Sequence, residues 1–91
     1  MISDNMDNWR TLISEELQIN SESFEDIIKI TLSEKDLDKE FDSGYGGSEG
    51  EPFTAWIKNY VYFPAVYDGA EWVESVPRNP SDEETPHVGG Q

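Results

Sequence analysis

One stretch of the sequence, residues 52–77, constrains the fold more than any other. Apolar and polar residues alternate along it, and it holds two of the three Trp and three of the four Tyr. Alternation with a period of two is typical of a strand with one buried face. Asp68-Gly69 separates two such runs and suits a tight hairpin turn, because both residues tolerate a positive φ. We therefore predict an antiparallel meander of three strands, at residues 53–57, 61–67 and 71–76.

Pro64 falls in the middle of this predicted sheet. A proline has no N–H to donate to a ladder, so it belongs at an edge or a bulge. We expect the middle strand to bulge there, or the last strand to pair mainly with residues 66–67. Helices can cover only one face of such a sheet, so some aromatic residues must stay partly exposed. Tyr60 and Tyr62 fit the core and a partner contact about equally well.

The first half of the chain has helical periodicity instead. Over residues 5–18 the apolar spacing predicts an amphipathic helix capped by Asn5 or Asp7. Ser33 followed by Asp36 is typical of a capping box and predicts a second, short helix over residues 33–41. The apolar stripe of the first helix consists of Met6, Trp9, Leu12, Ile13 and Leu17.

Residues 20–32 fit two patterns. Ser21 and Ser23 suit a helix start, whereas the apolar residues that follow alternate with polar ones as in a strand. A short helical turn that leads into a short strand satisfies both. We thus predict one α+β domain over residues 1–80, with an N-terminal helix, a second short helix and a C-terminal three-stranded antiparallel β-meander. Residues 81–91, rich in Pro, Gly and acids, predict an irregular acidic tail.

Charge narrows the possible functions. Twenty Asp and Glu face six Lys and Arg, which gives a net charge of −14. Direct binding to nucleic acid or to anionic lipid requires a basic surface, so the charge argues against both. A basic protein is the partner that it favours, and the alternative is that the charge serves only solubility. No run is long and apolar enough to span a membrane and Cys is absent, so we expect a soluble, cytoplasmic protein.

Little in the sequence indicates catalysis. His87 is the only histidine and lies in the predicted tail. Adjacent carboxylates carry little information in so acidic a chain, and the acids of the Gly-rich loop at residues 42–51 match no calcium-loop spacing. We expect no catalytic residue, no metal site and no cofactor.

The acids of the first half could act together. Ten of them fall between residues 15 and 42, with only three bases among them. Duplex DNA carries a negative charge about every 1.7 Å, so carboxylates at similar separation could fill the groove of a nucleic-acid-binding protein. Their alignment depends on the fold. Together with the two tyrosines, the predicted partner-binding residues are Glu15, Glu16, Glu22, Glu25, Asp26, Glu34, Asp36, Asp38, Glu40, Asp42, Tyr60 and Tyr62.

Residues 41–80 resemble small acidic proteins encoded by bacteriophages and prophages. The resemblance rests on Phe53-Thr54-Ala55-Trp56, Val61-Tyr62-Phe63-Pro64 and Tyr67-Asp68-Gly69. Several such proteins disarm restriction or CRISPR nucleases of the host, some by imitating DNA. The resemblance therefore implies a non-enzymatic inhibitor in the bacterial cytoplasm that binds a basic, nucleic-acid-binding host protein. The alternative is a phage structural or accessory module that packs against another protein through exposed sheet aromatics.

Overall fold

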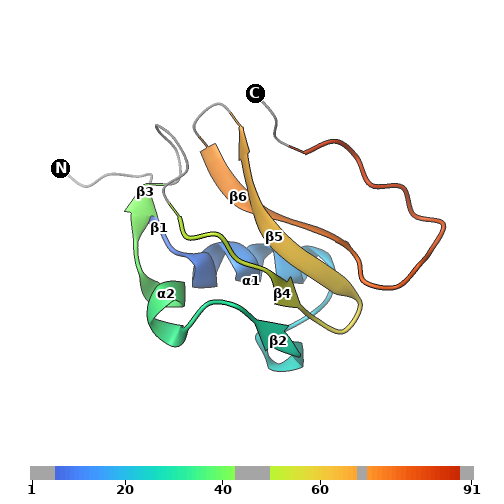
Figure 1. Cartoon of the computed structure of the whole chain (residues 1–91), viewed down its shortest axis with the longest axis horizontal. Coiled ribbons are helices and arrows are strands. Elements are labelled where there is room, and N and C mark those ends of the chain that lie inside the picture. The colour runs from blue at the N-terminus through green and yellow to red at the C-terminus, as the bar shows by residue number, and fades with distance from the viewer. Residues whose placement is uncertain (1–5, 43–49, 68–69, 89–91) are drawn as a thin grey trace.

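The computed structural model describes residues 6–42, 50–67 and 70–88, which form an α+β fold (Figure 1). The predicted meander is present as three antiparallel strands, and a fourth short strand joins its edge. The order across this sheet is β2-β4-β5-β6. The strands span Lys29–Ile30 (β2), Ala55–Trp56 (β4), Tyr60–Tyr67 (β5) and Ala70–Pro77 (β6).

The N-terminal helix, α1 (Trp9–Ile19), begins later than predicted. Asn8 caps it, because its side chain accepts a hydrogen bond from the Thr11 N–H at 2.8 Å. The predicted start at residue 5 was wrong for a long-range reason. Met6 and Asp7 form strand β1 (Met6–Asp7), which pairs with β3 (Phe41–Asp42) in a second, two-stranded sheet. Met6 is consequently 43 % exposed and does not belong to the apolar stripe.

The second helix, α2 (Glu34–Asp38), has the predicted capping box. It ends before the predicted limit, since Phe41 belongs to β3. The predicted helical turn followed by a short strand within residues 20–32 is confirmed. Ser23 caps a 3-10 turn, η1 (Phe24–Asp26), and β2 follows three residues later. The predicted loop at residues 42–51 lies mostly outside the described residues.

Pro64 interrupts the hydrogen bonding of β5 with β4 and leaves the pairing of β5 with β6 intact. Pairing between β5 and β6 is unbroken from Tyr60↔Pro77 to Tyr67↔Ala70, so the predicted bulge or shortened pairing was wrong. The N–H of Ile57 donates to the carbonyl of Tyr60 at 2.9 Å, so the even-numbered residues of β5 direct their backbone groups toward β4. Pro64 therefore lacks its donor on the β4 side, where the ladder ends at Ala55↔Tyr62.

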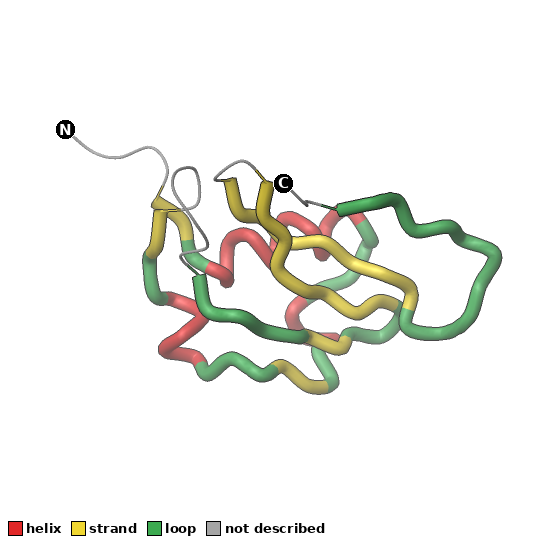
Figure 2. Tube along the Cα trace, turned by 45° about the horizontal axis from the view of Figure 1, so that its top comes forward, coloured by secondary structure: helices red, strands yellow, loops and turns green. Residues whose placement is uncertain are grey.

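Helix α1 covers one face of the sheet, and the core lies between them. Trp9, Ile13 and Leu17 of the helix are almost fully buried with Tyr62 and Val73 of the sheet. Figure 2 shows residues 78–88 as an irregular segment that extends beyond the strands.

Trp9 fixes the position of the chain where it enters the sheet. Its ring lies 4.8 Å from that of Phe41 and 4.9 Å from that of Phe53, centroid to centroid. Its Nε1 donates to the carbonyl of Glu51 at 3.0 Å. A Cβ at position 50 would lie 2.5 Å from Trp9 Cζ2, so only glycine fits beneath the indole.

Candidate functional site

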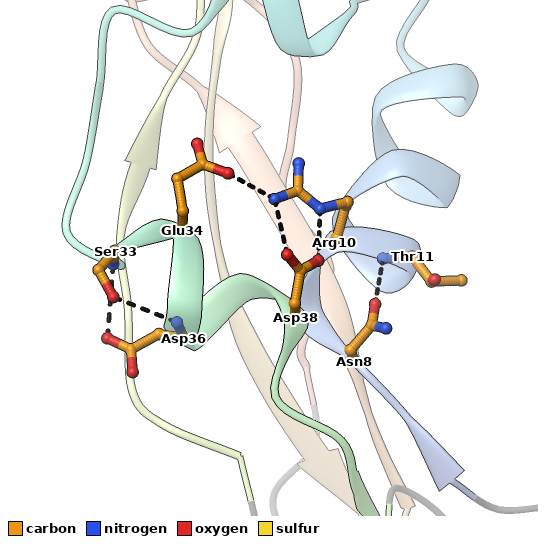
Figure 3. A network of polar contacts seen from close by, with 7 residues as sticks. All are labelled: Asn8, Arg10, Thr11, Ser33, Glu34, Asp36 and Asp38. Atoms are coloured by element: carbon orange, nitrogen blue, oxygen red, sulfur yellow. Dashed lines mark hydrogen bonds and ion pairs between the residues drawn. The ribbon is translucent and has the colours of Figure 1, made fainter.

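Arg10 forms ion pairs with two of the predicted partner-binding acids. Its Nε lies 2.6 Å from Asp38 Oδ1, and its Nη2 lies 2.6 Å from Glu34 Oε1, so the guanidinium joins α1 to α2 (Figure 3). The pair with Asp38 is bidentate, with Nη2 3.3 Å from Oδ2. These hydrogen bonds hold the pKa of Asp38 below its usual range. Glu34 and Asp38 therefore have an internal partner already.

Asp36 has a structural role in the same helix. Its N–H donates to the Ser33 hydroxyl at 3.1 Å, and its carboxylate accepts from the Ser33 N–H at 3.4 Å (Figure 3). This reciprocal arrangement stabilises the first turn of α2 and satisfies two backbone donors. Local chemistry thus explains Asp36 without a partner.

A second network connects α1 to the sheet through Tyr62, which is fully buried. Its hydroxyl donates to Glu22 Oε1 at 2.6 Å and accepts from Asn20 Nδ2 at 3.1 Å. The same amide donates to Ser75 Oγ at 2.9 Å, and that hydroxyl donates to Glu16 Oε2 at 3.1 Å. Burial, and then the hydrogen bond to Glu22, raise the pKa of Tyr62. Its burial removes Tyr62 from the residues that a partner can contact.

Glu16 and Glu22 stand at the two ends of this network, and none of its described members is a cation. The pKa of Glu16 is raised by burial, is lowered in part by the Ser75 hydrogen bond, and is raised again by the charge of Glu74. Glu22 also accepts from the N–H of Asn59 at 2.7 Å, which fixes the turn between β4 and β5. Both acids therefore support the fold.

The remaining predicted acids lie on the surface. Glu15 is on α1, Glu25 and Asp26 are on η1, and Glu40 follows α2; all four are exposed. These acids therefore come from three separate segments of the chain and not from one helix. The side chain of Asp42 lies outside the described residues.

Tyr60 stays close to the surface next to the core. Its ring packs edge-on against Tyr62 at 6.5 Å, and its hydroxyl donates to Glu83 Oε2 at 3.4 Å. The charge of Glu83 raises the pKa of Tyr60. Of the two predicted tyrosines, Tyr60 alone is within reach of a partner.

The face of the sheet opposite α1 gathers residues that the site prediction left out. Side chains alternate between faces, and the register places Trp56, Val61 and Val76 in one row across the strands, with Phe63 and Trp72 beyond them. All five are partly exposed. The expectation that some sheet aromatics stay exposed is confirmed, and the alternating pattern was the available signal. We call these five residues the open sheet face.

Two further features are absent from the described ranges. Nowhere in these ranges do three or more His, Cys, Asp or Glu side chains gather in a way that could hold a metal ion. None of the described helices has both the length and the apolar character needed to cross a membrane. Comparison with family models, with curated proteins and with solved structures found no match to this chain.

Proposed function

We propose that this protein is a non-enzymatic inhibitor that binds a basic, nucleic-acid-binding protein of the bacterial cytoplasm. The resemblance noted above favours a defence nuclease, of the restriction or CRISPR class, as that partner. The inhibitor competes with nucleic acid for the partner's basic surface and needs no cofactor.

The observation that carries the proposal is the negative charge that the fold leaves on the surface. Among the described residues, ion pairs join two bases to three acids: Arg10 to Glu34 and Asp38, and Lys39 to Glu51. Several acids of the described ranges lie outside these ion pairs and are exposed. The exposed carboxylates include Glu15, Glu25, Asp26 and Glu40, with Asp82, Glu83 and Glu84 in the irregular segment.

The distribution of these acids indicates how such an inhibitor acts. The exposed carboxylates come from α1, η1, the end of α2 and the irregular segment, whereas those of α2 are held by Arg10 and Ser33. A distributed field of this kind accelerates encounter with a basic surface and repels nucleic acid from it. We therefore propose that the protein imitates the overall charge of a polyanion and not the regular phosphate spacing of a duplex.

The test is capture from a bacterial lysate, followed by measurements on the captured protein in solution. We expect its affinity to fall by at least about tenfold between roughly 50 and 500 mM NaCl, because salt screens exposed charges. We also expect double-stranded DNA or RNA to displace the inhibitor. An affinity that is insensitive to salt, or a complex that binds nucleic acid unchanged, would exclude the proposal.

The open sheet face favours a second candidate, a phage accessory module that packs against another protein. The two candidates respond differently to substitution. Neutralising Glu25, Asp26 and Glu40 together weakens binding by a polyanion mimic, whereas binding by an apolar module is unchanged, because these exposed acids lie outside the open sheet face.

A further inference from the structure

No described helix packs on the open sheet face, and its five residues are partly exposed. The register places Phe63 directly opposite Glu74, and Trp72 opposite Ala65 on the same face. Ala65 is 7 % exposed. Trp56 adds a second indole on the neighbouring strand β4. Helix α1 packs on the opposite face only, against Val73 and Tyr62.

Trp72 and Glu74 form a fixed pair on this face. The indole Nε1 donates to Glu74 Oε2 at 2.7 Å, which orients the ring and leaves a carboxylate at its edge. An aromatic face attracts a cation through its quadrupole, and the carboxylate beside it attracts the same cation by charge. Lysine or arginine is the side chain that satisfies both groups at once.

The charges around the pair select the same occupant. A second copy of the chain is the wrong occupant, because each copy carries −14. Lys29 of β2 is a cation on the same face, but it lies at the edge of the sheet away from Trp72, where it pairs with Trp56 of β4.

We propose that the open sheet face is the docking surface for a basic amphipathic helix of the partner protein, with an arginine or lysine over Trp72 and against Glu74. A helix is the element that packs on a sheet face, as α1 does on the other side. Its apolar stripe covers Val61, Phe63 and Val76, and one of its basic side chains meets the carboxylate of Glu74. This inference rests on the proposed function and names the part of the basic partner that is recognised.

The test uses the intact protein and a synthetic peptide of about 18 residues, long enough for a stable contact, with Leu on one helical face and Lys and Arg on the other. A peptide of the same composition, with the Leu residues scattered around the helix, is the control. Trp9 is 1 % exposed, so a change in tryptophan fluorescence on binding reports mainly on Trp56 and Trp72. We expect the amphipathic peptide to bind at least about tenfold more tightly than the scattered one, with a blue shift of the emission.

Matched variants locate the contact. Trp72→Thr is expected to weaken binding about tenfold, and Trp72→Phe to restore most of it. Glu74→Gln is expected to weaken binding about threefold to tenfold, and Glu25→Gln, which removes the same charge from η1, by less than about twofold. Ile19→Thr, an apolar change at a side chain 74 % exposed on α1, is expected to leave binding unchanged. Urea unfolding confirms that each variant folds, and if Trp72→Thr does not, the Glu74 and Glu25 variants decide.

Four results would overturn the inference. Equal losses for Glu74→Gln and Glu25→Gln, with salt dependence intact, mean that total charge alone drives binding; the proposed function then survives without this docking surface. Equal affinity for the two peptides would likewise mean that total charge drives binding and that the open sheet face does not recognise an apolar stripe. A dimer in sedimentation equilibrium that Trp72→Thr dissolves makes a second copy the occupant. Loss of salt-dependent binding to every basic probe removes the proposed function as well.

Discussion

Two polar networks in this protein place carboxylates in opposite surroundings. Around Tyr62, Glu16 and Glu22 accept hydrogen bonds from neutral donors inside the junction of α1 and the sheet. Around Arg10, Glu34 and Asp38 meet a guanidinium at the surface, and their side chains are 86 % and 60 % exposed. The first network contains two carboxylates and no described cation, and the second contains two carboxylates and one cation.

The difference shows that number and charge alone do not reveal the role of an acid in this chain. A buried hydrogen bond without its partner leaves a desolvated group, so the Tyr62 network is costly to disturb. When an exposed ion pair is broken, water solvates both charged groups, so disturbing the Arg10 network should change the free energy of unfolding only a little. We therefore expect the fold to depend more on the Tyr62 network than on the Arg10 network. The predictions below test that ordering.

The largest effect is expected at Tyr62. Tyr62→Phe removes a hydroxyl that serves both Glu22 and Asn20, and we expect the free energy of unfolding to fall by about 1–3 kcal/mol. Urea denaturation followed by tryptophan fluorescence measures it. Tyr60→Phe is the matched control, because its hydroxyl has only a 3.4 Å contact with Glu83 at the surface. Equal losses at the two tyrosines would contradict the ordering.

Next comes the cap of α2, which borders the Arg10 network. Ser33→Ala removes the hydroxyl that accepts from the Asp36 N–H, and we expect a loss of about 1 kcal/mol. Ser33→Asp supplies a carboxylate at the same position and should retain most of the stability. The measurement is again urea unfolding, and an unchanged midpoint for Ser33→Ala would mean that tertiary contacts alone hold this helix.

A smaller effect is expected when Arg10 is replaced by Met. The substitution keeps an apolar stem near Phe24 and removes both ion pairs, so the loss should stay below that of Ser33→Ala. It should also shrink toward zero as salt rises to about 1 M, because the pairs are exposed. Unfolding midpoints at low and high salt check this. A large loss that does not depend on salt would place Arg10 with the buried network.

The smallest effect is a pH dependence of opposite sign in the two networks. The folded-state pKa of Glu16 is raised by burial, so its contribution is fully present below the ordinary carboxyl pKa and is lost as pH rises through the raised value. The pKa of Asp38 is lowered by Arg10, so its contribution is present above the ordinary value and is lost as pH falls through the lowered one.

Unfolding midpoints between about pH 3 and 7 separate these two contributions. Relative to wild type, Glu16→Gln should gain stability as pH rises, because Gln stays neutral in the same place. Asp38→Asn should be least stable relative to wild type near neutral pH and approach it on acidification. Parallel curves for the two variants would show that the networks do not differ in this respect.

Local chemistry explains which parts of the fold could be predicted from the sequence. Ser33 and Asp36 identify a helix start by themselves, and the alternation at residues 60–77 places β5 and β6 within one residue of their observed ends. β4 is shorter than the predicted residues 53–57, because Pro64 ends its ladder. β1 and β3 could not be predicted, since two-residue strands 34 or more positions apart leave no periodic signal.

The candidate site was harder to predict than the fold. Arg10 is 28 residues from Asp38 and 24 from Glu34, so only the folded chain reveals which acids it neutralises. Tyr60 and Tyr62 are two residues apart and lie on the same face of β5, yet one is partly exposed and the other fully buried. Alternation assigns a residue to a face, and only the position of α1 on that face decides how much of the side chain is covered.

Pro64 has a mechanical consequence for the whole sheet. At Val61 the sheet is four strands wide, whereas beyond Pro64 only the ribbon of β5 and β6 continues. A two-stranded ribbon coils more strongly than a wide sheet, so its outer half is turned relative to its base. Trp56 lies in the wide half and Trp72 in the narrow half, so the two indoles stand at different angles to the mean plane of the sheet.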